Sequence, residues 1–126
     1  MDVVRYPYAL LEEPAPGPEG VAVAGLRDLA TMKLAAIARR GIRRDFWALH
    51  EITAHGVPLG RALDDYVVRY GVSHSDLYHV LRALTYFEDA ERDAVWPGGL
   101  TPRHWQTIRS HFERVVPLEF KRRTGQ

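Results

Sequence analysis

The chain has 126 residues, the length of one ordinary domain and enough to bury a core without disulfides or metal ions. Hydrophobic residues make up 46% and charged residues 26% of it, which excludes disordered and fibrous proteins. The chain has no cysteine, so thiol catalysis, thiolate zinc sites and disulfides are excluded. No apolar run approaches the roughly 18 residues of a membrane span and no signal-type segment opens the chain, so we expect a cytoplasmic protein.

Two short extended segments are expected near the start of the chain, at 3–6 (VVRY) and 21–23 (VAV). A proline-rich loop over 12–20 separates them. Two strands this short form a marginal sheet by themselves, so their partner strands are expected elsewhere in the fold or in a second chain.

From Gly25 onward the apolar periodicity predicts helices, so the fold class is mainly α (α+β) in a single domain over 1–126, with strands and loop to residue 25. Caps mark several helix ends: Gly71 follows the third helix, Ser73 begins the fourth and Thr101 begins the fifth. Pro117 is expected to end the fifth helix and leave a solvated tail. The predicted helices cover about 26–40, 43–55, 59–70, the segment from 74 into the acidic stretch before 93, and 102–116.

Two charged residues interrupt the apolar faces of the first two predicted helices. Lys33 falls in the middle of the apolar arc of the first helix, and Asp45 falls between Leu49 and Ile52 on the second. An unpaired charge in such a place is costly, so each residue needs a partner or an open cleft. One interpretation is a structural Lys33–Asp45 pair, or a Lys33 side chain that reaches water at the helix edge. The other is a cleft in which Lys33 meets a phosphate, with the basic turn at 39–44 beside it.

The segment 28–46 (DLATMKLAAIARRGIRRDF) carries a resemblance to a known family. It resembles the D-L-A-x-M-K-x-x-A-x-x-x-R-G-x-x-R-D-F block of the AbiEii/AbiGii-type nucleotidyltransferases, which include toxins of abortive-infection systems. Three further pieces agree in order along the chain: 6–8 (YPY), 84–91 (LTYFEDAE) and Trp105. The match corresponds to the later, C-terminal portion of that family.

The resemblance implies a nucleotidyltransferase fold, in which a small mixed sheet carries catalytic carboxylates and a helical part follows. It implies that Lys33 and Arg44 lie near the nucleotide phosphates and that Asp45 is a catalytic residue of the same patch. For a complete family member it also implies Mg²⁺, a nucleoside triphosphate, an RNA acceptor and a cognate antitoxin.

The sequence departs from the family pattern in two ways. Ala48 stands where family members usually carry a second acid, three residues after Asp45. The chain contains no Asp-x-Asp, the acidic pair that would hold the metal ions of nucleotide transfer. We therefore expect the C-terminal part of an AbiEii-like enzyme, contributing phosphate contacts, binding no metal or cofactor alone and inactive without a catalytic half.

The alternative is a non-catalytic helical interaction module, either a homodimer paired through its strands or an RNA-binding domain using the basic turn at 39–44. A helix-turn-helix DNA reader has less support, because His50 and Glu51 stand where a polar recognition face would be expected. None of the six histidines has the i, i+4 spacing of a helical metal site, and they are expected to be surface or interhelical polar residues.

Overall fold

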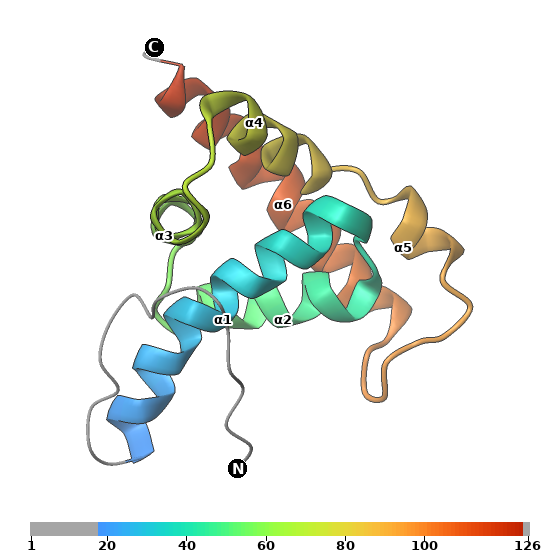
Figure 1. Cartoon of the computed structure of the whole chain (residues 1–126). Coiled ribbons are helices and arrows are strands. Elements are labelled where there is room, and N and C mark those ends of the chain that lie inside the picture. Colours follow the sequence, from blue (N-terminus) through green and yellow to red (C-terminus); the bar gives the residue numbers. More distant parts are fainter. Residues whose placement is uncertain (1–17, 125–126) are drawn as a thin grey trace.

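The computed structural model describes the backbone of residues 18–124 and the side chains from residue 25 to 124. Within this part of the chain there are six helices and no strands (Figure 1). The helices are α1 (Pro18–Arg40), α2 (Arg43–Ala54), α3 (Leu59–Tyr70), α4 (His74–Ala83), α5 (Glu88–Arg92) and α6 (Pro102–Arg123). None of those described is long and apolar enough to cross a lipid bilayer.

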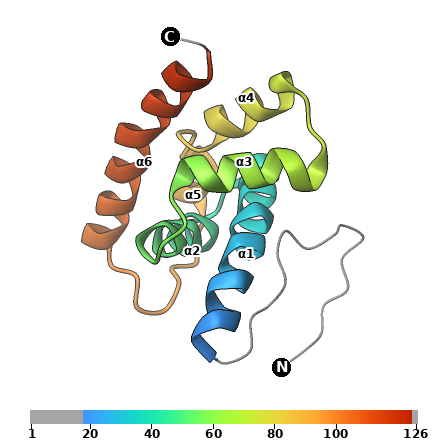
Figure 2. The ribbon, with the colours of Figure 1, turned by 90° about the vertical axis from the view of Figure 1, so that its left-hand side faces the viewer.

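Helix α1 is the element around which the others assemble. It packs against α2, α3 and α4, while α6 packs against α2 and α4 (Figures 1 and 2). Figure 2 shows α3 crossing α1, with α6 on the far side of α2. The core therefore lies between α1 and α6, and α2 is enclosed by both.

The caps predicted from the sequence are confirmed at α3, α4 and α6. Gly71 ends α3 in the left-handed conformation at φ 60°, which glycine adopts without strain. The Ser73 side chain accepts a hydrogen bond from the backbone N–H of Asp76, and the Thr101 side chain accepts one from that of His104. These local signals set the helix ends because each satisfies a backbone group that the helix itself leaves unpaired.

The prediction of strands near the N-terminus is wrong where it can be tested. Residues 21–23 lie inside α1, which begins at Pro18 rather than near Leu26. Residues 3–6 lie outside the described part of the chain. Three residues are too few to distinguish strand from helix by periodicity, and a proline at the first helical position favours a helix start there.

The fourth helix is shorter than expected, because the chain turns after Ala83 and forms a separate α5. Phe87 at this turn is buried, with its ring centroid 5.2 Å from that of Phe46 and 6.0 Å from that of Trp105. The turn thus brings Phe87 into an aromatic cluster contributed by α2 and α6. Such long-range contacts cannot be predicted from the local pattern.

Pro117 does not end the last helix, which continues to Arg123. Pro117 is solvent-exposed, and its missing N–H removes one hydrogen bond from the helix ladder. The residues beyond it are held by packing: the Phe120 ring stacks on Tyr78 of α4, with centroids 5.5 Å apart. The continued helix buries Val116, and Val115 is partly buried against the core.

The basic tail is not fully solvated either. Arg123 is only 13% exposed, lies 2.9 Å from the Asp64 carboxylate and donates to the backbone carbonyl of Gly60, also at 2.9 Å. Glu119 of the same helix pairs with it at 3.1 Å. Arg123 therefore fastens the end of α6 to α3.

The centre of the core is Phe46, which is fully buried. Its ring meets Trp105 and Phe112 of α6 edge-on, at centroid separations of 5.8 and 5.7 Å. Gly41, in the turn between α1 and α2, lies against the same ring: a Cβ at Gly41 would stand 2.6 Å from Phe46 Cε2. The turn between α1 and α2 is close only because residue 41 has no side chain.

This contact predicts opposite effects for one substitution at two glycines. Gly41→Ala forces the buried Phe46 ring to shift and should lower the free energy of unfolding by about 1–3 kcal/mol. Gly25→Ala, where no atom lies within 4 Å of the added Cβ, should raise it by about 0.5–1 kcal/mol through helix propensity. Urea unfolding of both variants measures the difference, and equal effects would contradict the packing argument.

Candidate functional site at the α1–α2 corner

The structure brings together the two charged residues that interrupt the apolar faces. Lys33 Nζ donates to Asp45 Oδ1 at 3.2 Å, across the interface between α1 and α2. The Lys33 side chain is 25% exposed and the Asp45 side chain 13%, so the pair lies at the edge of the core. The structural interpretation of the two charges is confirmed to this extent. Their assignment to a nucleotide site stays a prediction.

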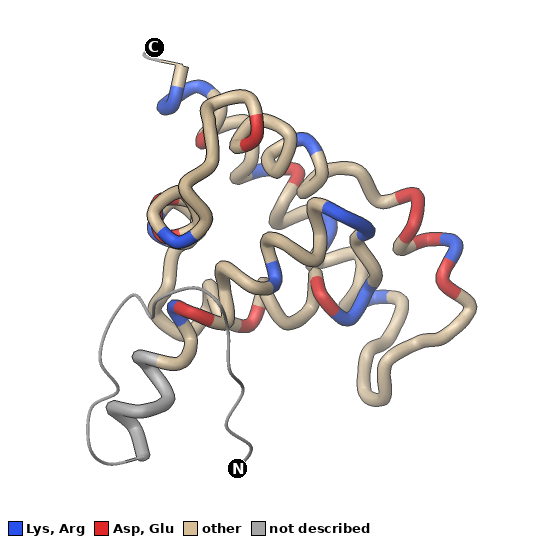
Figure 3. Tube along the Cα trace, viewed as in Figure 1, with Lys and Arg blue, Asp and Glu red and all other residues tan. Residues whose placement is uncertain are grey.

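Four arginines stand between Lys33 and Asp45 in the sequence, at the end of α1 and the start of α2. We define the α1–α2 corner as Lys33 together with residues 39–45. Figure 3 shows basic positions at the end of α1 and the start of α2, across from the acidic α5. Arg39, Arg40 and Arg44 are exposed and, among the described residues, form no ion pair or hydrogen bond through their side chains. Three guanidinium groups at the corner are therefore available to an anion.

Arg43, the remaining basic residue, has a different role. Its guanidinium is buried and donates to the backbone carbonyls of Asp93 and Glu91, just after and at the end of α5. The Trp96 ring lies over the same group, 3.8 Å from Arg43 Cζ. Arg43 thus holds the α5 segment against the start of α2, and it belongs to the structure of the corner rather than to its anion-accessible surface.

Helix α5 is also held against α6, through the side-chain carboxylate of Glu91. Glu91 accepts hydrogen bonds from Trp105 Nε1 at 2.8 Å and from Arg109 at 2.7 Å, both on α6. Burial alone would raise the pKa of Glu91, but the hydrogen bonds from Trp105 and Arg109 outweigh it and lower the pKa below its ordinary value.

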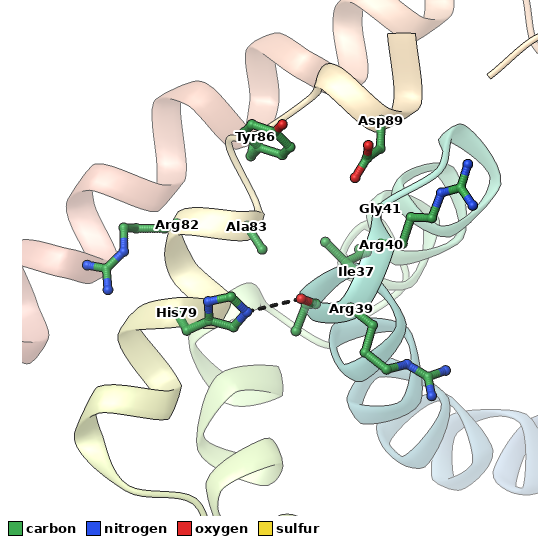
Figure 4. Close-up of a pocket in the computed structure, with 10 residues that line it drawn as sticks. Ile37, Arg39, Arg40, Gly41, His79, Arg82, Ala83, Tyr86 and Asp89 are labelled. Atoms are coloured by element: carbon green, nitrogen blue, oxygen red, sulfur yellow. Dashed lines mark hydrogen bonds between the residues drawn. The ribbon is translucent and has the colours of Figure 1, made fainter. Parts of the chain in front are cut away.

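A hollow of about 310 Å³ opens beside the corner (Figure 4). It lies between the end of α1, the end of α4 and the turn that leads to α5, and its floor is apolar, with Ile37 and Ala83. His79 Nε2 donates to the carbonyl of Ala38 at 3.1 Å, one of the α1 carbonyls left unpaired by the helix end. In Figure 4 Arg39 and Arg82 extend away from the hollow, whereas Asp89 points toward Gly41.

Lys33, Arg44 and Asp45 do not line this hollow. The hollow and the residues predicted for phosphate contact are therefore not one site, although Arg39, Arg40 and Gly41 of the corner line the hollow.

The fold also gathers histidines that sequence spacing kept apart. His50 of α2 lies with its ring centroid 4.8 Å from His111 and 6.4 Å from His104, both on α6. Burial lowers the pKa of both His50 and His111. The i, i+4 spacing rule does not identify this cluster because it joins two helices, although His104 and His111 share a helix face since seven residues make two turns.

Comparison with known proteins decides the family. A family model described as "Nucleotidyl transferase AbiEii toxin, Type IV TA system" matches residues 1–123, which is nearly the whole chain. This chain belongs to the AbiEii toxin family. The resemblance of segment 28–46 is thereby confirmed, and a toxin–antitoxin context is consistent with the family description.

One curated relative of this AbiEii-family chain is an uncharacterised protein of Aquifex aeolicus (strain VF5). It is 34% identical over 114 residues, which cover 89% of this chain and 53% of the relative. The chain therefore spans about half the length of the curated relative that it matches. No solved structure matches the chain.

The α1–α2 corner does not fit the Mg²⁺ ion that the family implies. A catalytic Mg²⁺ requires oxygen ligands, typically from a pair of carboxylates. The carboxylate that the corner offers is that of Asp45, and it is already paired with the Lys33 ammonium, whose charge opposes a second cation.

The contacts of Glu91 predict how acid affects this AbiEii-family chain. A carboxylate whose pKa is lower in the folded state stabilises it above the unfolded value of about 4.5, and that stabilisation is lost as the pH falls through the folded pKa. Glu91→Gln should therefore reduce the loss of unfolding free energy between neutral pH and about pH 3. Glu113→Gln, which removes a longer 3.4 Å contact to the same Arg109, is the control and should keep the wild-type profile. Urea unfolding at a series of pH values measures both, and identical profiles for Glu91→Gln and the wild type would contradict the assignment.

Proposed function

We propose that the α1–α2 corner binds the phosphates of a nucleotide, as part of an AbiEii-type nucleotidyltransferase whose metal-binding carboxylates are supplied by other residues of the assembled protein. The observation that carries this proposal is the partly exposed Lys33–Asp45 pair beside the uncommitted Arg44. All three residues lie in the segment that resembles the family block, and the family model covers them.

The Lys33–Asp45 ion pair is suited to open, so that Lys33 can bind a phosphate in place of the Asp45 carboxylate. Lys33 keeps a quarter of its exposure, so a phosphate oxygen can approach its ammonium without entering the core. An ion pair at this depth contributes little to stability, and a triphosphate offers the ammonium a larger opposite charge than one carboxylate does. Arg44, exposed next to Asp45, would add a forked contact to the same phosphate chain.

In this proposal Asp45 acts by positioning Lys33. Its carboxylate holds the ammonium at the edge of α1 before the nucleotide arrives. The catalytic role that the resemblance implies for Asp45 stays a prediction. It requires that the carboxylate become free once Lys33 has moved to the phosphate.

The 126-residue chain should not transfer nucleotides by itself, because it contains no Asp-x-Asp. The purified chain, incubated with Mg²⁺, radiolabelled nucleoside triphosphates and total RNA, should give no labelled product. Robust metal-dependent transfer would contradict the proposal. Sequencing the source DNA upstream of residue 1 tests the same point, since an in-frame Gly-Gly turn followed by Asp-x-Asp would supply the carboxylates.

Phosphate binding can be measured on the chain as it stands. Calorimetric titration with each nucleoside triphosphate should detect binding that weakens with salt. Lys33→Met and Arg44→Gln should each weaken it by about tenfold, the effect of one charge-assisted hydrogen bond. Arg61→Gln, which removes an exposed arginine of α3 away from the corner, is the matched control and should leave the affinity unchanged.

A charge swap separates a binding role from a purely structural one. In the double variant Lys33→Asp/Asp45→Lys the ion pair can re-form, so thermal stability should stay close to that of the wild type. Nucleotide affinity should nevertheless fall, because the ammonium now projects from α2. Unchanged affinity in the swapped variant would overturn the assignment of Lys33 to the phosphates.

The alternative function, a non-catalytic interaction module, has lost one of its supports. Pairing of strands across a homodimer relied in part on residues 21–23, and these are helical. The exposed Arg39 and Arg40 still favour the version that binds RNA. The RNA-binding module would be favoured over our proposal if the chain bound RNA in a salt-sensitive manner but bound no nucleotide. RNA binding should then be lost in the double variant Arg39→Gln/Arg40→Gln and kept in Lys33→Met.

A further inference from the structure

We propose that His50 and Glu51 of α2, with His104 of α6, form a binding site for a zinc ion. One potential ligand atom from each of these residues lies within 4.8 Å of the other two. This inference is independent of the phosphate contacts proposed above, because the cluster uses different residues and a different end of α2.

The distances are close to those that a zinc ion requires. A tetrahedral zinc ion with bonds of about 2.1 Å keeps its donor atoms about 3.4 Å apart. Side-chain rotations that move the donors by roughly an ångström would therefore close the present arrangement around an ion. Glu51 is exposed and His104 half-buried, so both have room for such rotations.

The three side chains are chemically uncommitted in the described part of the chain. His50 Nδ1 is buried and has no hydrogen-bond partner there, which is costly for an imidazole nitrogen. The Glu51 carboxylate forms no ion pair and accepts no hydrogen bond among the described residues. The contacts of the His104 ring are edge-on approaches to Trp47 and His50, which leave its ring nitrogens available. A metal ion would give all three groups a partner at once.

The donor set selects the type of metal. Two imidazoles and a carboxylate suit zinc, whereas Mg²⁺ and Ca²⁺ prefer oxygen ligands alone. Three protein ligands leave a fourth position for water. Glu51 stands in the last turn of α2, where a cation complements the helix dipole and where no basic residue is present.

The fold, not the chain, creates this site. His50 and Glu51 are neighbours near the end of α2, and His104 stands in the first turn of α6, 53 residues after Glu51, where the Thr101 side chain caps its backbone N–H. An ion bound by both helices would link α2 directly to the start of α6. Zinc should therefore stabilise the folded chain when it binds.

The test is zinc titration of the tag-free chain after treatment with a chelator. Competition with a chromophoric chelator at pH 7.5 should show one tightly bound Zn²⁺ per chain, and Co²⁺ should give the visible absorption of a four-coordinate site. Zn²⁺ should raise the midpoint of thermal unfolding by several degrees, while an equal concentration of Mg²⁺ should not.

Variants decide which residues bind the metal. His104→Gln and Glu51→Gln should each weaken zinc binding by at least tenfold, while circular dichroism shows that both remain folded. His74→Gln removes an exposed histidine from α4 and is the matched control; it should not change the affinity. His111→Gln tests the neighbouring ring and should have little effect. The proposal would be overturned if the chain did not bind Zn²⁺, or if both ligand variants kept the wild-type zinc affinity. It would also be overturned if His111→Gln lost zinc binding while His104→Gln kept it.

Discussion

The contact between Gly41 and the Phe46 ring is the constraint on which the rest of the structure depends. It lets α2 follow α1 after only two residues, with the backbone N–H groups of Asp45 and Phe46 both donating to the carbonyl of Ile42. The turn then places Phe46 between α1 and the aromatic residues of α6. The same turn aligns Asp45 with Lys33 and directs Arg43 to the end of α5. The core and the surface corner are therefore consequences of one close approach.

The ion pairs of α1 differ in burial, and this difference separates their roles. Toward α3, Arg27 pairs with Asp65 at 2.7 Å and is 23% exposed, much like Lys33, whereas Arg69 is completely buried and pairs with Asp28 at 2.5 Å. Breaking such a buried pair leaves a charge in the core and is strongly destabilising. Toward α2, the Lys33–Asp45 pair is nearer the solvent and can open at little cost. The Arg69–Asp28 pair is thus suited to holding the fold, and the Lys33–Asp45 pair to meeting a ligand.

Helix α2 connects the two proposed sites. Its first turn contributes Asp45 to the corner, and its last turn contributes Glu51 to the proposed zinc ligands. Between them Phe46 and Leu49 are fully buried, so the helix has little freedom to move against the core. A ligand at either end would therefore bind to a rigid element, which lowers the entropy lost on binding. Membership of the AbiEii family gives the corner its nucleotide interpretation, while the histidine cluster rests on the geometry of this chain alone.

Local chemistry in the sequence determined the features that need only neighbouring residues. The caps at Ser73 and Thr101, the left-handed Gly71 and the family block at 28–46 could all be predicted, because each is written in a few consecutive positions. The wheel positions of Lys33 and Asp45 likewise showed that two charges required partners. Periodicity failed at 21–23 because so short a segment fits either helix or strand.

Tertiary structure decided what depends on contacts between distant segments. Phe87 separates α5 from α4 by joining the cluster around Phe46, and the packing of Phe120 and Arg123 carries α6 past Pro117. The approach of His104 to His50 depends on how α6 lies against α2 and has no signal in linear spacing. Sequence determines which residues could pair or bind; the free energy of packing selects among them, because it is summed over residues that only the folded chain brings together.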